Sequence, residues 1–214
     1  MLDRNIPFYN TLMRCDTYDE SAVRKALAGL PDAVFLRGYQ PGDEDGWAAL
    51  HLETGDFDDF EEARDYFFNT YTADEDWLGE RSVFAVERAS GRIVGACIAW
   101  RDPAKKSVRE TSPGATVASL HWLVVAEDFQ RRGIGAALCA SVLRIYHENG
   151  EFPVYLHTQP WSYAAILLYD TLGFRLQKTD AFGSYENQYD DAVKTLKTVL
   201  SADDMARLCE KSED

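Results

Sequence analysis

Apolar and polar residues alternate along this chain with two periods, one helical and one extended. Apolar residues recur every three to four positions over residues 16–28, 45–54, 58–71, 134–147 and 162–173, which predicts a helix in each segment. Shorter apolar or alternating runs predict strands at residues 33–39, 81–88, 92–101, 117–125, 153–159 and 174–179. The final stretch, 186–211, has helical spacing again and predicts one or two further helices.

The two strands at 81–88 and 92–101 flank the short segment Ala-Ser-Gly, which predicts a hairpin. A hairpin excludes a purely parallel, doubly wound sheet. Strands mixed with helices on either side of a hairpin instead predict an α+β fold, layered as α/β three-layer proteins are, around a mixed sheet.

The turn between residues 125 and 134 carries the strongest chemical signal. It follows an apolar strand, contains Arg131, Arg132, Gly133 and Gly135, and leads into an alanine-rich helix. The first amides of a helix lack intrahelical partners and carry partial positive charge. Glycines let a ligand approach those amides, and the arginines add full charges. The turn is therefore suited to a phosphate or pyrophosphate.

Three phosphate-binding motifs compete for this turn. A dinucleotide fingerprint needs glycine at position 138, where Leu138 stands, and the Gly-Lys-Ser/Thr of a P-loop is absent. The remaining match is Q/R-x-x-G-x-G/A, here Gln130 to Gly135. This segment resembles the pyrophosphate-binding motif of the GCN5-related N-acetyltransferases, the GNAT superfamily.

A second segment, "SYAAILLYDTLGF" at 162–174, resembles the N-x-x-A-x-x-L-Y-x-x-x-G-F signature of the same family. The residues in register are Ala165, Leu168, Tyr169, Gly173 and Phe174, and Ser162 stands where asparagine is common. The resemblance covers residues 33–179. We therefore predict a helical extension at 1–32, a GNAT domain at 33–179, and a helical tail at 180–214 packed on the same domain.

The resemblance implies a mixed, mostly antiparallel central sheet of the acyl-CoA N-acyltransferase (GNAT) type, with helices on both faces. It also implies acetyl-CoA as co-substrate, with no metal. The strand before the turn would bind the pantetheine arm through its main chain, and the turn would bind the pyrophosphate. The implied coenzyme-binding residues are Leu123, Val124, Val125, Gln130, Arg131, Arg132, Gly133, Ile134, Gly135, Ala136 and Ser162.

Acetyl transfer to an amine needs a group that takes a proton from the ammonium and one that protonates the leaving thiolate. Tyr169 matches the family's general acid. His121 is the candidate base, because imidazole titrates near neutrality and strand alternation would place it on the face of Val125. The alternatives are Glu127, Asp128 or an acid of residues 41–80 acting through water, and, more weakly, His157.

Charge narrows the class of partner. The chain has a formal net charge of −14 and a pI near 4.7, which argues against a nucleic-acid binder. Residues 41–80 contain 14 acids and one base, Arg64. Two interpretations stay open: a field that attracts a cationic acceptor, such as a polyamine or aminoglycoside, or a pair of solvated acidic helices.

The remaining features set the expected context. No apolar run reaches the roughly 18 residues of a membrane span, and the first residues do not resemble a signal peptide. Cys15, Cys97, Cys139 and Cys209 are widely spaced, which is typical of reduced thiols in a cytoplasmic protein. We predict an acyltransferase that acts on a small-molecule or peptide amine as a monomer or homodimer, without nucleic acid or membrane. The alternative is a non-catalytic acyl-CoA sensor of the same fold.

Overall fold

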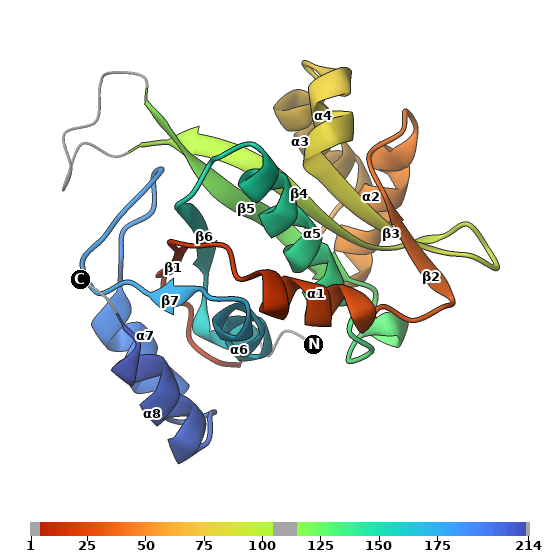
Figure 1. The fold of residues 1–214 in the computed structure, drawn as a ribbon. Helices are drawn as coiled ribbons and strands as arrows, with labels where there is room; N and C mark the ends of the chain where they lie inside the picture. Colours follow the sequence, from red (N-terminus) through yellow and green to blue (C-terminus); the bar gives the residue numbers. More distant parts are fainter. Residues whose placement is uncertain (1–4, 105–114, 213–214) are drawn as a thin grey trace. The chain divides into compact units, whose positions relative to one another are not determined.

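The computed structural model describes residues 5–104 and 115–212. Within them the strands form a seven-stranded sheet in the order β2-β3-β4-β5-β6-β1-β7 (Figure 1). The strands are β1 (Thr11–Cys15), β2 (Val34–Arg37), β3 (Ser82–Glu87), β4 (Ile93–Pro103), β5 (Thr116–Val125), β6 (Val154–Thr158) and β7 (Arg175–Leu176).

The helices are α1 (Glu20–Ala28), α2 (Asp43–Glu53), α3 (Phe60–Tyr71), α4 (Glu75–Arg81), α5 (Ile134–Glu148), α6 (Tyr163–Thr171), α7 (Tyr189–Leu196) and α8 (Ala202–Glu210). Two 3₁₀ turns, η1 (Glu127–Phe129) and η2 (Pro160–Ser162), precede α5 and α6. The pairs β2–β3, β3–β4, β1–β6 and β1–β7 are antiparallel, and β5–β6 is parallel. The sheet is therefore mixed and mostly antiparallel, as expected.

The described chain divides into two compact units. Unit 1 comprises residues 20–99 and 121–145, and unit 2 comprises residues 5–19, 100–104, 115–120 and 146–212. Strands β4 and β5 each contribute one part to unit 1 and the other part to unit 2.

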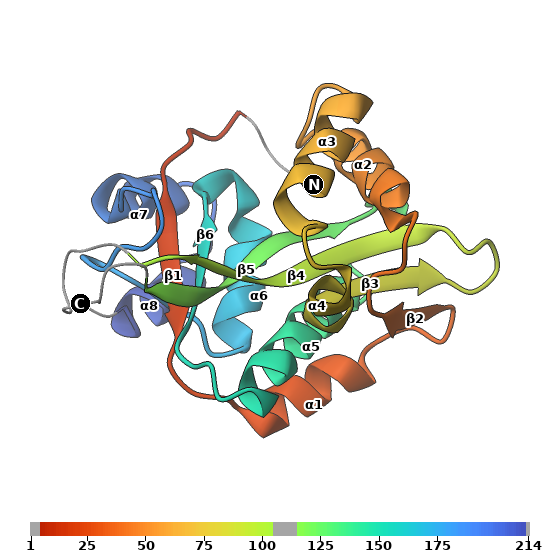
Figure 2. The same ribbon diagram turned by 90° about the horizontal axis from the view of Figure 1, so that it is seen from above.

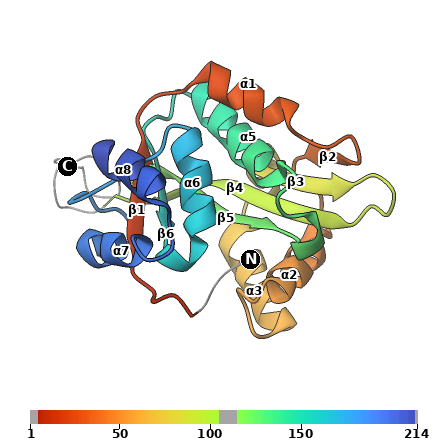
Figure 3. The same ribbon diagram turned by 90° about the horizontal axis from the view of Figure 1, so that it is seen from below.

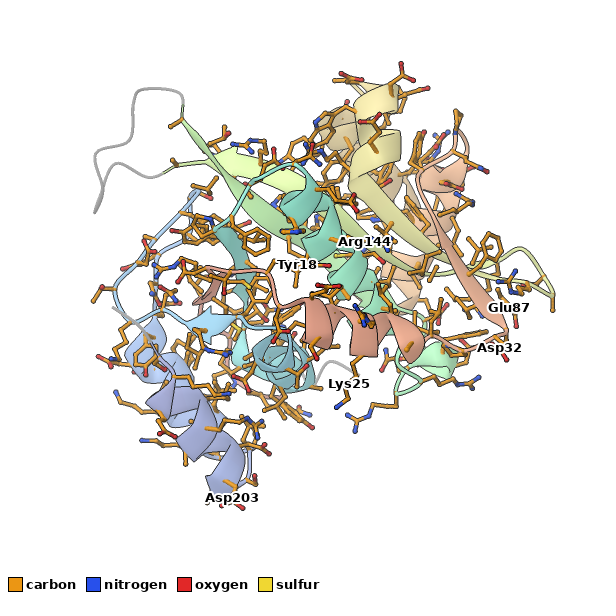
Figure 4. The ribbon with its side chains drawn as sticks, viewed as in Figure 1. Tyr18, Lys25, Asp32, Glu87, Arg144 and Asp203 are labelled. Atoms are coloured by element: carbon orange, nitrogen blue, oxygen red, sulfur yellow. The ribbon has the colours of Figure 1, made fainter. Side chains whose placement is uncertain are left out.

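In unit 1, helices cover both faces of the strands. Helices α1 and α5 lie side by side on one face, and α2 and α3 lie on the other (Figures 2 and 3). The largest side chains of this core include Trp47, Phe67, Tyr71 and Phe84, each 2% exposed or less. Figure 4 shows Asp32 and Glu87 together at the end of the β2–β3 pair, where Val34 is opposite Glu87. The hairpin predicted between 81–88 and 92–101 is confirmed as β3 and β4.

In unit 2, β1 is paired with β6 on one side and with β7 on the other. Its Arg14 is 8% exposed and donates to Asp16 and Asp180 at 2.8 Å each, so the buried guanidinium is neutralised within the unit. Helices α7 and α8 lie next to one another (Figures 1 and 3), and α7 is joined to the chain before β1 by the Gln188 N–H, which donates to the Asn10 carbonyl.

The sequence pattern missed two elements, β1 and α4. Strand β1 has five residues, all buried, and a charged arginine in the middle. Ion pairs with Asp16 and Asp180 allow this arginine to be buried. The alternation of polar and apolar residues cannot predict those ion pairs. Helix α4 has seven residues, too few for a helical period to show. Its start is set by the Asp74 side chain, which accepts from the Trp77 N–H at 2.9 Å.

Two further observations concern the chain as a whole. No helix among the described residues combines the length and the hydropathy that crossing a membrane requires. The four cysteines all lie in the described part and none forms a disulfide. Burial raises the pKa of the Cys15 thiol to about 11, which makes this thiol unreactive near neutral pH. The boundaries proposed for the domain at 33–179 stay a prediction.

Candidate active site

The turn between β5 and α5 has the backbone of an anion-binding loop. After η1, Arg131 has a φ of 63° and Gly133 a φ of 86°, so left-handed residues alternate with Arg132 before α5 begins at Ile134. Successive amides in such an alternation point into one concavity, which binds anions. A left-handed arginine is uncommon and is retained only where the surrounding structure imposes it. The φ values of Arg131 and Gly133 therefore give the loop the alternation found in anion-binding concavities.

The start of α5 adds to this concavity. The Ala137 N–H donates to the Gly133 carbonyl at 3.1 Å, which is the first bond of the helical ladder. The amides of residues 134–136 precede that bond and form the positive end of the helix. Arg131 and Arg132 are exposed beside them, and the Arg132 guanidinium lies 5.2 Å from the centre of the Phe129 ring. Backbone and side chains here together present positive charge.

The Gln130 side chain makes a hydrogen bond within the protein. Its Nε2 donates to the Val125 carbonyl at 3.0 Å, so the side chain ties the loop back to the end of β5. Leu123 and Val125 are partly exposed and Val124 is 5% exposed, which agrees with a strand whose alternate side chains pack inward. The parallel pairing of β5 with β6 comprises Ala118 with Val154 and Ser119 with Tyr155, after which β5 continues to Val125.

An ion-pair network supports the loop from outside, and sequence reasoning did not identify it. Arg92, after the hairpin turn, donates to Asp128 at 3.1 Å and to Glu53 at 2.7 Å. Glu53 also accepts from the Glu127 N–H at 3.1 Å. Asp128 thus takes part in an ion pair that is exposed to solvent. Glu53 lies 39 positions before Arg92 in the sequence and Asp128 lies 36 positions after it, so no local pattern in the sequence predicts their contacts with Arg92.

Gly133 is required at its position by contact as well as by backbone angle. A Cβ atom added there would lie 2.5 Å from the carbonyl oxygen of Gly29, at the end of α1. Helix α1 therefore packs directly against the loop, and it carries the exposed Lys25 on its outer side (Figure 4). Gly91 has a similar φ of 74° and nothing within 4 Å of an added Cβ, which makes it a matched control.

We expect Gly133→Ala to destabilise the fold by about 1–2 kcal/mol more than Gly91→Ala, because only Gly133 adds a backbone clash to the cost of a positive φ. We also expect it to weaken acetyl-CoA binding about tenfold or more, through displaced amides. Denaturant unfolding and calorimetric titration with acetyl-CoA would measure both effects. Equal effects of the two substitutions would show that the close approach to Gly29 is unimportant.

His121 lies on β5 in unit 1, four residues before Val125, where the strand ends and the loop begins. Its Nδ1 is 3.0 Å from the hydroxyl of Tyr71, at the end of α3. The next residue, Trp122, has a φ of 49°, which interrupts the regular strand. The expectation that His121 and Val125 share a face rested on unbroken alternation, so this structure does not support that argument.

An aromatic cluster surrounds this segment. Trp122 donates through Nε1 to the Tyr66 hydroxyl at 3.2 Å, and its ring centre lies 5.0–5.8 Å from those of Trp47, His51, Phe57 and Tyr66. His51 is fully buried, and burial lowers its pKa although the Asp56 carboxylate, 2.8 Å from Nδ1, opposes the shift. His51 is therefore a neutral core residue and not an exposed base.

Many acids of the 41–80 segment have structural partners. Arg37 pairs with Asp43, Arg64 with Asp45 and Arg92 with Glu53, while the Asp59 and Asp74 side chains cap α3 and α4. These ion pairs and helix caps give some of the acids in the segment a structural role. The exposed acids outside these contacts are Asp58, Glu61, Glu62, Asp65, Glu75, Asp76 and Glu80, and their charges can contribute to a field around an acceptor.

The other predicted residues lie in unit 2. Tyr169, on α6, is 6% exposed and its ring lies 5.8 Å from that of Phe174. Ser162 ends η2, and its hydroxyl accepts from Gln159 Nε2 at 3.2 Å. His157, the weaker base candidate, has its Nε2 2.6 Å from Asn10 Oδ1 and stacks on Tyr185 at 4.0 Å. The loop and His121 thus belong to unit 1, and Ser162, Tyr169 and His157 belong to unit 2.

Comparison with known proteins decides the family. The model of the acetyltransferase (GNAT) family matches residues 47–174, more than half of the chain. The chain belongs to the GNAT family. The match includes the loop at 130–136 and the second signature at 162–174. These are the two segments on which the prediction of the GNAT family was based. It leaves out β1, α1, β2, β7, α7 and α8.

Relatives within the GNAT family include mycothiol acetyltransferases. That of Paenarthrobacter aurescens is 29% identical over 162 residues, covering 72% of this chain and 46% of the relative. That of Thermobispora bispora is 31% identical over 150 residues, covering 68% of this chain and 48% of the relative. The chain therefore spans about half the length of the relatives it matches.

Solved structures agree with the GNAT fold. A GCN5-related N-acetyltransferase from Sphaerobacter thermophilus superposes with a TM-score of 0.56 at 22% identity, over 80% of this chain and 49% of that one. An aminoglycoside N-acetyltransferase in complex with CoA superposes with a TM-score of 0.54 at 18% identity, over 72% of this chain and 95% of that one. At these identities the likeness shows the fold alone. The expected mixed sheet with helices on both faces is confirmed.

Proposed function

We propose that this chain transfers the acetyl group of acetyl-CoA to a primary amine, by direct attack of the amine within a ternary complex. The observation that carries the proposal is the loop from Gln130 to Ala136. Its left-handed Arg131 and Gly133, its two exposed arginines and the start of α5 form an anion site. Membership of the GNAT family and the CoA complex of an aminoglycoside acetyltransferase with the same fold support acetyl-CoA as the anion.

The residues of the chain fit this co-substrate. The amides of residues 134–136 and the arginines would bind the pyrophosphate, and the main chain of Leu123 to Val125 would bind the pantetheine arm. The Val125 carbonyl accepts one bond from Gln130, and an oxygen with two lone pairs can accept a second. The resemblance to the family also assigns the Ser162 hydroxyl to this co-substrate. No metal is needed, because the thioester is already an activated acyl donor.

In the proposed reaction the amine nitrogen bonds to the thioester carbonyl carbon and the carbon–sulfur bond breaks. His121 takes a proton from the ammonium, so that the neutral amine can attack. Tyr169 gives its hydroxyl proton to the leaving sulfur, which departs as a thiol, and the tyrosinate regains a proton when the attached nitrogen loses its second proton to become the amide. The alternatives to His121 are Glu127, Asp128, whose carboxylate pairs with Arg92, or an acid of residues 41–80 acting through water.

The acceptor would be a small molecule or peptide that carries a primary amine. The relatives named as mycothiol acetyltransferases support a small-molecule acceptor. The exposed acids of α3 and α4 favour a cationic one, because their field would concentrate it near unit 1. Since these relatives are about twice as long as the matched region, the acceptor is to be found by experiment.

Free-thiol release from acetyl-CoA tests the proposal against a panel of polyamines, aminoglycosides, amino sugars, arylalkylamines and peptides, at low and high salt. We expect turnover of at least one amine. If the acceptor is a polycation, salt should reduce turnover, because exposed charges are screened within about 10 Å at 0.1 M. Thermal stabilisation by acetyl-CoA without thiol release from any amine would contradict the proposal and indicate a sensor of the same fold.

A further inference from the structure

Tyr71 and His121 form a polar contact within unit 1. The Tyr71 hydroxyl lies 3.0 Å from His121 Nδ1, and the two residues are 50 positions apart in the sequence. Tyr71 is 2% exposed, whereas His121 is only partly buried. The contact thus joins a core side chain to the histidine that the proposed reaction uses.

The position of Tyr71 is well determined by its surroundings. It is the last residue of α3, and its ring lies 5.3 Å from that of Phe67 and 6.2 Å from that of Tyr66. Phenylalanine would fill the same space against these rings. The hydroxyl is therefore not required for the aromatic packing, and its contact with Nδ1 needs another explanation.

That contact sets which nitrogen of His121 can accept a proton. The hydrogen bond made by one ring nitrogen decides which nitrogen carries the hydrogen in a neutral imidazole. If Nδ1–H donates to the Tyr71 oxygen, Nε2 has the lone pair and can act as a base. In that tautomer, a proton taken from the ammonium is taken by Nε2.

We infer that Tyr71 is a positioning residue, whose hydroxyl accepts from Nδ1–H of His121 and thereby holds the ring in its base-competent tautomer and orientation. This inference rests on the proposed function, in which His121 is the base; Tyr71 would hold His121 in place for that role. Tyr71 itself touches neither substrate nor reacting atoms in this role. It lies within residues 47–174, and its partner lies on the strand that leads to the coenzyme loop.

Four proteins test the inference kinetically: Tyr71→Phe, His121→Gln, the double variant, and Tyr39→Phe as control. Tyr39 is also a buried tyrosine of unit 1, and its hydroxyl donates to Glu44 at 3.0 Å. We expect Tyr71→Phe to lower kcat about tenfold with an unchanged KM for acetyl-CoA, as one part of the 10²–10⁴-fold effect of a general base. In the His121→Gln background it should cause no further loss.

A spectroscopic measurement tests the contact without using activity. In protein labelled with ¹⁵N-histidine, the ring signals of His121 are identified by their loss in His121→Gln. We expect them to shift or exchange between tautomers in Tyr71→Phe and to stay in place in Tyr39→Phe. Unchanged signals in Tyr71→Phe would overturn the hydrogen bond itself.

The outcomes separate the two proposals. Changed ring signals with unchanged kcat, or equal losses by Tyr71→Phe with and without His121, would overturn the positioning role and leave acetyl transfer standing. If the unmodified protein acetylates no amine, the proposed function fails and the base role with it, whereas the ¹⁵N spectra still report whether Tyr71 holds the tautomer.

Discussion

Replacing Tyr169 by phenylalanine is expected to lower the rate of acetyl transfer about 100-fold while leaving acetyl-CoA binding intact. General acid catalysis contributes typically 10²–10⁴-fold, and phenylalanine removes only the proton donor. The ring packs beside Phe174 and is 6% exposed, so phenylalanine keeps the apolar contacts of the site. Turnover by thiol release and affinity by calorimetric titration with acetyl-CoA would be measured on the same preparation.

Tyr163→Phe is the matched control for this prediction. Tyr163 is the first residue of the same helix, is partly exposed, and would lose the same single oxygen. We expect it to retain the turnover of the unmodified protein. If Tyr169→Phe also keeps full turnover, Tyr169 is not the acid. A loss of acetyl-CoA affinity as large as the loss of turnover would instead assign the hydroxyl to binding.

Replacing Asp170 by asparagine is expected to destabilise the protein by about 3 kcal/mol, at the lower end of the range for breaking a buried ion pair. The Asp170 side chain is 3% exposed and accepts from Arg175 at 3.1 Å, Arg207 at 2.8 Å and Lys211 at 3.5 Å. Asparagine keeps the size but removes the charge that faces three cations. Arg207 and Lys211 are about two-fifths exposed, so water partly compensates them, which places the effect at the lower end.

Thermal and denaturant unfolding measure this effect, with Asp191→Asn as control. Asp191 pairs with Lys194 at 3.0 Å, but both side chains are more than half exposed, so its loss should cost within about 0.5 kcal/mol. For a chain of this length, 3 kcal/mol lowers Tm by roughly 6–12 °C. An effect no larger than that of Asp191→Asn would show that the cluster formed by Asp170 with Arg175, Arg207 and Lys211 contributes little to stability.

The Asp170 cluster also gives the C-terminal helix a physical role. Arg207 and Lys211 belong to the end of α8, opposite Asp203 in its first turn, which Figure 4 labels at the far end of the helix. They bind the residue that follows Tyr169 on α6. Asp170→Asn should therefore loosen α8 as well as lower stability, and limited proteolysis near residue 200 would detect that change.

Local signals in the sequence determined most of the helices and strands, because each depends on neighbouring residues. The hairpin follows from alternating apolar runs around Ala-Ser-Gly, and the anion loop from glycines and arginines between a strand and a helix. The family follows from two segments, 130–136 and 162–174, because both resemble signatures of the GNAT family and both lie within the residues that the family model matches. The candidate residues Tyr169 and His121 were identified by register in those segments or beside them.

Tertiary structure alone decided the features that depend on residues far apart in the chain. Strand β1 is stable because Arg14 meets Asp180, 166 positions away, and the loop is held because Arg92 meets Glu53 and Asp128. The partner of His121 is Tyr71, and Gly133 is confined by Gly29. Hydrogen bonds, ion pairs and steric contacts of this kind act over a few ångströms in space, whereas sequence periodicity reports only the few residues on either side.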